Sequence, residues 1–215
     1  MIGNLKKGRP MSLYDKYILP SFLNCACGSK PINYQRQKVV PQASGVILEV
    51  GIGSGLNIPF YDRSKVEEVI GLDPSPELNA MAKKVADEYN LPVDFMLSGA
   101  EEMALPNNYV DTVLVTYTMC TIPDVLSANK EMLRVLKPGG KLIFCEHGLA
   151  PDANVSKWQS RIDPFWGKIA GGCHLNRNIP ELIRSAGFQI QTMDEMYLPS
   201  TPKFAGYNYW GTAVL

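Results

Sequence analysis

The sequence is poor in cysteine and histidine, and their scarcity narrows the chemistry available to it. Its 215 residues include five cysteines and two histidines. The cysteines are odd in number and scattered, which argues against a disulfide framework and favours a reducing, cytoplasmic compartment. Cys25 and Cys27 form one close pair, but no second Cys or His pair has the spacing of zinc ligands. We therefore expect no metal.

Long apolar runs are also missing. The longest uncharged stretch, residues 17–29, has thirteen residues and contains Pro20 and Asn24. A membrane-spanning helix needs about 18–20 apolar residues, so we predict none. The amino terminus lacks a continuous apolar segment followed by a small-residue cleavage site, so we predict no secretory signal.

The chain has no net charge, because 21 basic residues balance 21 acidic ones, but the charges are unevenly distributed. Residues 1–40 hold seven basic side chains and one acid, a formal charge of +6. We expect this arm to be solvated. The alternative is peripheral contact with an anionic membrane surface. Because the chain as a whole is neutral, we expect no nucleic-acid partner.

From residue 46 onward, short apolar runs alternate with helical patterns. Strands are predicted at 46–50, 69–73, 93–97, 112–116 and 142–146, helices at 75–90, 123–135 and 180–186, and two late segments at 188–196 and 207–215. This alternation indicates an α/β fold with a parallel sheet. Ligands of such sheets bind at the carboxyl ends of the strands, so function should concentrate in the turns that follow them.

The strongest functional motif follows the first predicted strand and reads Glu49-Val50-Gly51-Ile52-Gly53-Ser54-Gly55. Glycines at this position accept positive φ and let a ligand approach the backbone closely. The dinucleotide fingerprint G-x-G-x-x-G would need a third glycine where Leu56 stands. The Glu49 carboxylate would repel a pyrophosphate but suits a ligand that carries an ammonium or sulfonium group.

Two later turns add candidate contacts for a nucleoside. Asp73 ends the second predicted strand, where it can accept hydrogen bonds from both hydroxyls of a ribose. Its alternative role is to stabilise the start of the helix that Ser75 caps. Residues 98–102 follow the third predicted strand and could offer backbone amides and a carboxylate to an adenine edge, or form a solvated loop.

Taken in order, these motifs resemble those of the class I S-adenosylmethionine (SAM) methyltransferases, in particular the type 11 methyltransferase-domain group. The resemblance spans about residues 44–147 and includes the segments 71–75, 100–101 and 134–140. It implies an α/β, Rossmann-like domain with a seven-stranded, mostly parallel sheet whose last strand is antiparallel. It also implies S-adenosyl-L-methionine as the cofactor.

The family pattern assigns the glycines to the methionine moiety, Asp73 to the ribose and the neighbourhood of Ala100 to the adenine. The cofactor-binding residues that it implies are Glu49, Gly51, Gly53, Gly55, Asp73, Pro74, Ala100, Glu101, Thr116 and Tyr117. The sequence departs from the pattern at Gly99, where many members have Asp. Adenine recognition would then rest on the backbone or on Glu101.

A narrower resemblance, to small thiol S-methyltransferases, extends through segments 146–147, 158–159, 163–166 and 172–175. Animal members of that group carry an N-terminal membrane anchor, which we do not expect here. His147 follows a central strand and is predicted to be the general base, although it could instead hydrogen-bond within its loop. Trp158 and Trp166 are predicted to line the acceptor pocket or to pack a lid onto the sheet.

We predict an N-terminal helical cap or arm at residues 1–40 and a methyltransferase domain at residues 41–215, with a lid insertion at 148–178. The predicted reaction is methyl transfer to a small apolar or amphiphilic acceptor, a thiol in the first place. A phospholipid or other amine is the alternative acceptor. Two other classes are a nicotinamide-dependent oxidoreductase, which Leu56 and Glu49 disfavour, and a SAM-binding module without catalysis. The protein is expected to be cytoplasmic or membrane-peripheral.

Overall fold

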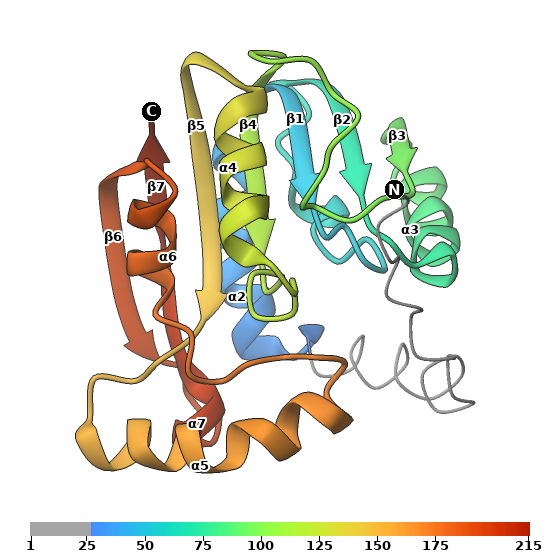
Figure 1. Cartoon of the computed structure of the whole chain (residues 1–215). Helices are drawn as coiled ribbons and strands as arrows, with labels where there is room; N and C mark the ends of the chain where they lie inside the picture. The colour runs from blue at the N-terminus through green and yellow to red at the C-terminus, as the bar shows by residue number, and fades with distance from the viewer. Residues whose placement is uncertain (1–26) are drawn as a thin grey trace, which may run out of the picture.

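The computed structural model describes residues 27–215, so most of the predicted basic arm lies outside the described residues. These residues form one seven-stranded sheet with the order β3-β2-β1-β4-β5-β7-β6 (Figure 1). The strands are β1 (Gly45–Val50), β2 (Val66–Leu72), β3 (Val93–Met96), β4 (Val110–Thr116), β5 (Leu136–His147), β6 (Gln189–Tyr197) and β7 (Tyr207–Val214). All pairings are parallel except those of β7, which confirms the predicted sheet.

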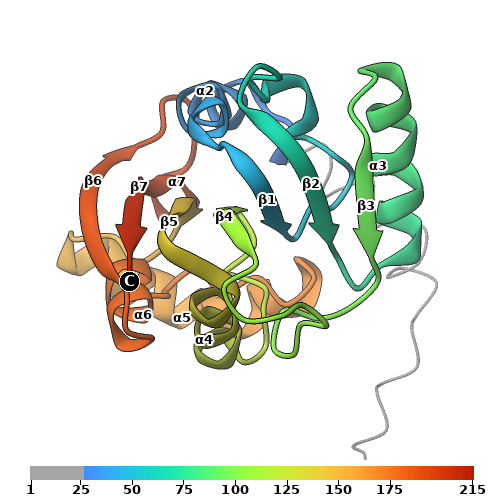
Figure 2. The same cartoon turned by 90° about the horizontal axis from the view of Figure 1, so that it is seen from above.

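Helices cover both faces of the sheet (Figure 2). One face packs against α2 (Lys30–Val39) and α3 (Pro76–Glu88), the other against α4 (Val125–Val135) and α6 (Ile179–Ser185). Strand β1 is buried on both sides, because Ile47 faces the first pair of helices and Leu48 the second. Helix α5 (Ala153–Ile169) lies at the carboxyl edge of the parallel strands, beside the short α7 (Lys203–Gly206) (Figure 1). Single 3-10 turns occur at Val40–Gln42 and Ile58–Phe60.

Capping residues set the helix starts. The Ser75 hydroxyl accepts a hydrogen bond from the backbone N–H of Leu78 at 3.2 Å, which confirms the predicted cap of α3. Helix α4 begins at Val125 rather than at Pro123, because the Asp124 carboxylate accepts from Ser127 N–H and so occupies the capping position. Leu126, in the first turn of this helix, is 37% exposed.

Residues 137–140, part of the segment 134–140 that carries the family resemblance, interrupt the pairing of strand β5. Leu136 pairs with Val110, but the next pair joins Lys141 to Thr112, so four residues on β5 are skipped against one on β4. Gly139 takes a φ of +82° in this segment, which the absence of a side chain permits.

Helix α2 corrects the prediction of a solvated arm for its part of the chain. Val39 and Val40 are fully buried, and Arg36, counted among the arm's charges, is only 4% exposed. Amphipathic packing against the sheet therefore outweighs the charge of this segment. Between residues 27 and 215, no helix has the length and apolar character needed to cross a bilayer.

Candidate functional site

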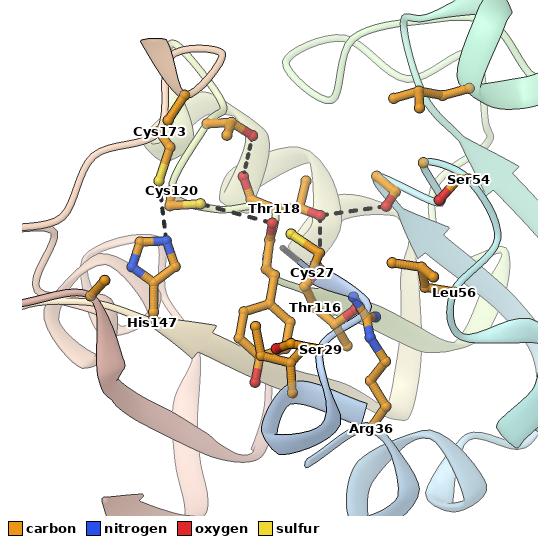
Figure 3. A pocket seen from close by; sticks show the side chains of 18 of the residues that line it. Cys27, Ser29, Arg36, Ser54, Leu56, Thr116, Thr118, Cys120, His147 and Cys173 are labelled. Carbon is orange, nitrogen blue, oxygen red and sulfur yellow. Dashed lines mark hydrogen bonds between the residues drawn. The ribbon is translucent and has the colours of Figure 1, made fainter. Parts of the chain in front are cut away.

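A cavity of about 340 Å³ opens at the carboxyl ends of the parallel strands, beneath α5 and α7. Its walls come from the loop after β1, the ends of β2, β4 and β5, helix α2 and the segment after α5. Of the predicted site residues, those that line it are Gly51, Gly53, Asp73, Thr116, Tyr117, His147 and Trp166. In Figure 3, Ser54 and Leu56 lie on one side and His147, Cys120 and Cys173 on the other.

The three glycines of the loop after β1 have different structural roles. Gly51 has a φ of +72°, and a Cβ there would overlap the side chain of Thr118. Gly53 lines the cavity, and a Cβ there would make an ordinary contact of 3.8 Å with the Gly51 carbonyl oxygen. Gly55 does not line the cavity: its φ is +84°, and a Cβ would come within 3.0 Å of Ala82 Cα in α3. The third glycine therefore brings the loop close to helix α3, rather than to a ligand.

Asp73 stands at the end of β2 and is 7% exposed. Its Oδ2 accepts from Gly53 N–H at 3.1 Å and its Oδ1 from Ser75 N–H at 2.8 Å. Burial raises the pKa of this carboxyl, and the two backbone hydrogen bonds act against that rise. The carboxylate thus ties the glycine-rich loop to the start of α3 while lining the cavity.

Glu49 lies behind the cavity wall, at 1% exposure, which differs from the predicted direct contact with a cationic ligand. Tyr61 Oη donates to its Oε2 at 2.6 Å, and Asn57 Nδ2 donates to its Oε1 at 2.9 Å. Burial raises the pKa of Glu49 to about 7 despite both hydrogen bonds and the nearby Arg36. Glu49 therefore positions Asn57 and Tyr61 in this structure.

Arg36 is a cavity residue that the sequence analysis did not assign. Its guanidinium donates to Asn57 Oδ1 at 2.5 Å and to Thr116 Oγ1 at 2.7 Å. The guanidinium carbon also lies over the ring of Tyr117, 5.3 Å from the ring centroid. The Nε of Arg36 is buried and has no hydrogen-bond partner among the described residues. A cation with unused donor capacity beside a glycine-rich loop can bind a carboxylate.

Tyr117, directly after β4, has a φ of +54° and donates its hydroxyl to Asn208 Oδ1 at 2.8 Å. Three other predicted cofactor residues do not line the cavity. Pro74 is exposed, Ala100 packs in the core at 6% exposure, and Glu101 accepts a long hydrogen bond of 3.4 Å from Asp124 N–H. The turn after β3 therefore directs the side chains of Ala100 and Glu101 away from the cavity in this structure.

The far end of the cavity holds an imidazole and two thiols. His147 Nε2 lies 3.2 Å from Cys173 Sγ, and Cys120 is next to both (Figure 3). The neighbouring Cys120 thiol and His147 lower the pKa of Cys173 to about 4, although burial opposes this. Burial disfavours the imidazolium form of His147, but Cys173 raises its pKa overall. We call Cys120, His147 and Cys173 the sulfur–imidazole cluster.

The backbone around the cluster is held from several sides. Buried Glu146 accepts hydrogen bonds from Thr118 N–H at 2.7 Å and Met119 N–H at 3.0 Å, and Arg177 donates to the Met119 carbonyl. His174 N–H donates to the Cys120 carbonyl at 2.9 Å, joining the two cysteine-bearing segments. The sequence predicted neither this pairing nor the roles of Glu146 and Arg177.

Helix α5 orients its residues differently from the prediction. Trp166 lines the cavity and packs edge-on against Phe204, with ring centroids 5.9 Å apart. Trp158 is 50% exposed and is not among the residues that line the cavity. The buried face of α5 carries Gln159 and Asp163. Because successive helical residues differ by about 100°, Trp158 points away from that face.

Comparison with known proteins identifies relatives of the chain. The model of a methyltransferase domain family matches residues 48–144. Thiol S-methyltransferase TMT1B of Rattus norvegicus is 34% identical over 169 residues, which cover 74% of this chain and 68% of the relative. Thiol S-methyltransferase TMT1A of Homo sapiens is 29% identical over 178 residues, covering 81% and 72%. Phosphatidylethanolamine N-methyltransferase of Cereibacter sphaeroides is 33% identical over 128 residues, covering 57% and 62%.

Solved structures show the same fold. A SAM-dependent methyltransferase of Thermotoga maritima, described as a possible histamine N-methyltransferase, superposes with a TM-score of 0.66 at 18% identity. The match covers 94% of this chain and 97% of that one. The [4+2]-cyclase SpnF superposes with a TM-score of 0.65 at 21% identity, covering 85% and 78%.

Proposed function

The chain belongs to the class I SAM-dependent methyltransferases, and from this premise we propose that it transfers the methyl group of SAM to a small thiol. That it is a methyltransferase with SAM as its cofactor follows from the family. The choice of acceptor is the proposal. Its first support is the similarity to thiol S-methyltransferases over about three quarters of the chain.

One observation in the cavity favours a thiol over an amine. Asp73, at the glycine-rich end, is the sole carboxylate among the described lining residues. The opposite end is lined by the sulfur–imidazole cluster and by apolar side chains such as Ala170, Leu175 and Leu198. A cationic amine would find no carboxylate there to offset its desolvation. A neutral thiol does not need one, so the apolar end suits it.

The cofactor would bind along the other end of the cavity. We assign Gly51 and Gly53 to the methionine moiety, Asp73 to the ribose hydroxyls and Arg36 to the carboxylate of the methionine moiety. The position of the Arg36 cation in the cavity wall, with the glycine-rich loop in the same wall, supports the last assignment. To meet a ribose, Asp73 would exchange its hydrogen bond with Gly53 N–H for one from a hydroxyl.

Methyl transfer needs little from the protein beyond positioning and exclusion of water. The acceptor sulfur attacks the methyl carbon in line, the bond from that carbon to the sulfonium breaks, and S-adenosylhomocysteine leaves. The thiolate is the nucleophile, so the acceptor must lose its proton. The sulfur–imidazole cluster stands at the acceptor end, in a place where it can take part in that loss.

The test of the acceptor is release of S-adenosylhomocysteine from SAM. We would compare a small alkyl thiol, phosphatidylethanolamine vesicles and a reaction without acceptor. Turnover with the thiol alone is expected. Turnover with vesicles alone would overturn the thiol proposal and favour the phospholipid alternative, for which the Cereibacter sphaeroides relative is the precedent.

Two tryptophans of α5 provide a matched pair for locating the acceptor. Trp166→Ala removes an aromatic wall of the cavity, so we expect KM for the thiol to rise about tenfold with little change in Kd for SAM. Trp158→Ala, on the exposed side of the same helix, should leave both constants unchanged. Equal effects of the two substitutions on thiol KM would contradict this location.

A further inference from the structure

The sulfur–imidazole cluster has a composition that the mechanism above does not require. Cys120 Sγ, Cys173 Sγ and one ring nitrogen of His147 all lie within 4.8 Å of one another. In a tetrahedral zinc site, bonds of about 2.3 Å to sulfur and 2.0–2.1 Å to nitrogen place ligand atoms roughly 3.5–4 Å apart. Small side-chain shifts would therefore bring all three atoms to coordinating distance of one ion.

The segments that carry these atoms are fixed before any ion binds. Cys120 lies on the loop after β4, which Glu146 and Arg177 hold through its backbone. Cys173 lies on the segment after α5, where Asp163 accepts from Leu175 N–H at 2.6 Å. His147 ends β5. Such preorganisation of ligands by a second layer of hydrogen bonds is typical of built metal sites.

The three ligand atoms favour one kind of metal ion, and their position in the cavity favours a catalytic over a structural role for it. Two sulfurs and one imidazole suit Zn²⁺, whereas Mg²⁺ and Ca²⁺ prefer oxygen ligands. Structural zinc sites are usually closed by four protein ligands, but catalytic sites keep one position for water or substrate. All three residues line the cavity, so a fourth position would face the space that we assign to the acceptor.

We propose that Cys120, His147 and Cys173 bind a zinc ion whose open coordination position takes the sulfur of the acceptor thiol. The ion site itself stands on the geometry of the three side chains, and its catalytic use rests on the proposed thiol acceptor. In this arrangement His147 is a metal ligand through Nε2, in place of the general base predicted from the sequence.

The chemical step balances with the reactants already named. The acceptor R–SH binds zinc as R–S⁻ and releases its proton to solvent, because a coordinated thiol is deprotonated. Its sulfur lone pair forms the new bond to the methyl carbon, and the electrons of the broken carbon–sulfonium bond stay on S-adenosylhomocysteine. The thioether R–S–CH₃ is neutral, so it is a weaker zinc ligand than the thiolate and can leave.

The surroundings of His147 Nδ1 affect the expected affinity of the cluster for zinc. The Nδ1 of His147 is buried and has no hydrogen-bond partner among the described residues. Zinc-bound histidines usually donate their second nitrogen to a carboxylate or carbonyl, and losing that bond lowers metal affinity about 10–100-fold. We therefore expect an ion that a strong chelator removes and added zinc restores.

The binding test uses the reduced protein after chelator treatment, titrated with Co²⁺ as a coloured substitute for Zn²⁺. We expect about one equivalent per chain, with thiolate-to-cobalt charge-transfer absorption that Zn²⁺ abolishes. Cys120→Ser and Cys173→Ser should each weaken that absorption, and should lower the affinity for Co²⁺ at least about tenfold.

The matched control is Cys145→Ser. Cys145 is a fully buried residue of β5 whose thiol forms a hydrogen bond with Tyr117 Oη and lies outside the cluster. This variant should bind as the wild type does. Loss of binding in the control alone, or binding unchanged by all three substitutions, overturns the site.

Measurements of activity distinguish a failure of the zinc proposal from a failure of the thiol proposal. If the proposal holds, thiol methylation falls at least about tenfold after zinc removal and returns with zinc. Equal thiol turnover with and without the ion would overturn the catalytic use of zinc while the proposed function stands. Cobalt binding at the cluster without thiol turnover in either form would overturn the proposed function, and with it the zinc-bound thiol, while the ion site stands.

Discussion

At the scale of single residues, the loop after β1 depends on Gly51. Gly51→Ala would push a Cβ into Thr118 and force an alanine to a φ of +72°. We expect Kd for SAM to rise at least about tenfold, because the loop must move from the cavity wall. Gly139→Ala is the matched control, since its φ is +82° but a Cβ there meets no atom of residues 27–215 within 4 Å.

The control separates backbone strain from the clash. Alanine at positive φ costs about 1 kcal/mol, so both variants should unfold at lower denaturant concentration than the wild type. Calorimetric titration with SAM should then distinguish them. Weakened SAM binding in Gly139→Ala would show that strain alone, and not the approach of Thr118, controls the loop.

Glu49 predicts a pH dependence of stability. Its pKa is about 7 in the folded protein, above the ordinary value of 4.5, because the ionised carboxylate is buried. An acid with a raised folded pKa binds more protons folded than unfolded in this window, so its contribution falls as pH rises from about 4.5 to 7. Relative to Glu49→Gln, the wild type should lose on the order of 2–3 kcal/mol of unfolding free energy between pH 5 and pH 8.

Urea unfolding at the two pH values measures this difference. Using the Gln variant as reference cancels other titrating groups that lie far from Glu49. A gain of wild-type stability relative to Glu49→Gln over the same interval would mean that Asn57, Tyr61 and Arg36 stabilise the carboxylate more than burial penalises it.

At the scale of elements, α5 holds the end of the cavity in place through Asp163. This carboxylate accepts from Leu175 N–H at 2.6 Å and contacts His174 Nδ1 at 2.8 Å. Asp163→Ala leaves the buried Leu175 N–H without an acceptor, so we expect a loss of about 1–3 kcal/mol in unfolding free energy. Thiol KM should rise severalfold because the segment that bears Cys173 loosens, whereas Kd for SAM should change little.

Asp152, which directly precedes α5, provides the control for this substitution. Its carboxylate accepts a hydrogen bond from Tyr197 Oη at an exposed position. Asp152→Ala should therefore cost less stability and leave thiol KM unchanged in the same steady-state assay. If Asp152→Ala raised thiol KM as much as Asp163→Ala does, the effect could not be assigned to the hydrogen bonds of Asp163. It would instead reflect a general loosening of helix α5.

At the scale of the whole molecule, the cavity joins loops from both halves of the sheet, so a bound cofactor should stabilise the entire fold. SAM at about 100 times its Kd contributes about 2.7 kcal/mol. For a chain of this length, that corresponds to a rise in Tm of roughly 5–10 °C. NADH at the same concentration should give no rise, and a shift with NADH but not SAM would contradict the cofactor assignment.

The sequence by itself determined the sheet, the position of the glycine-rich loop and the cap at Ser75. These features depend on neighbours along the chain: alternating apolar runs, glycines after a strand, and a hydroxyl three residues before the N–H that it accepts from. The cavity at the carboxyl edge followed from the same reasoning, because parallel strands end together.

Only the tertiary structure decided which side chains meet in that cavity. Arg36, counted from the sequence as a charge of the solvated arm, is a buried cavity residue. Trp158 points outward, and Cys173 Sγ lies 3.2 Å from His147 Nε2. Cys120, His147 and Cys173 lie on three segments far apart in the sequence. Their meeting depends on how loops pack and on buried anchors such as Glu146, which no local pattern encodes.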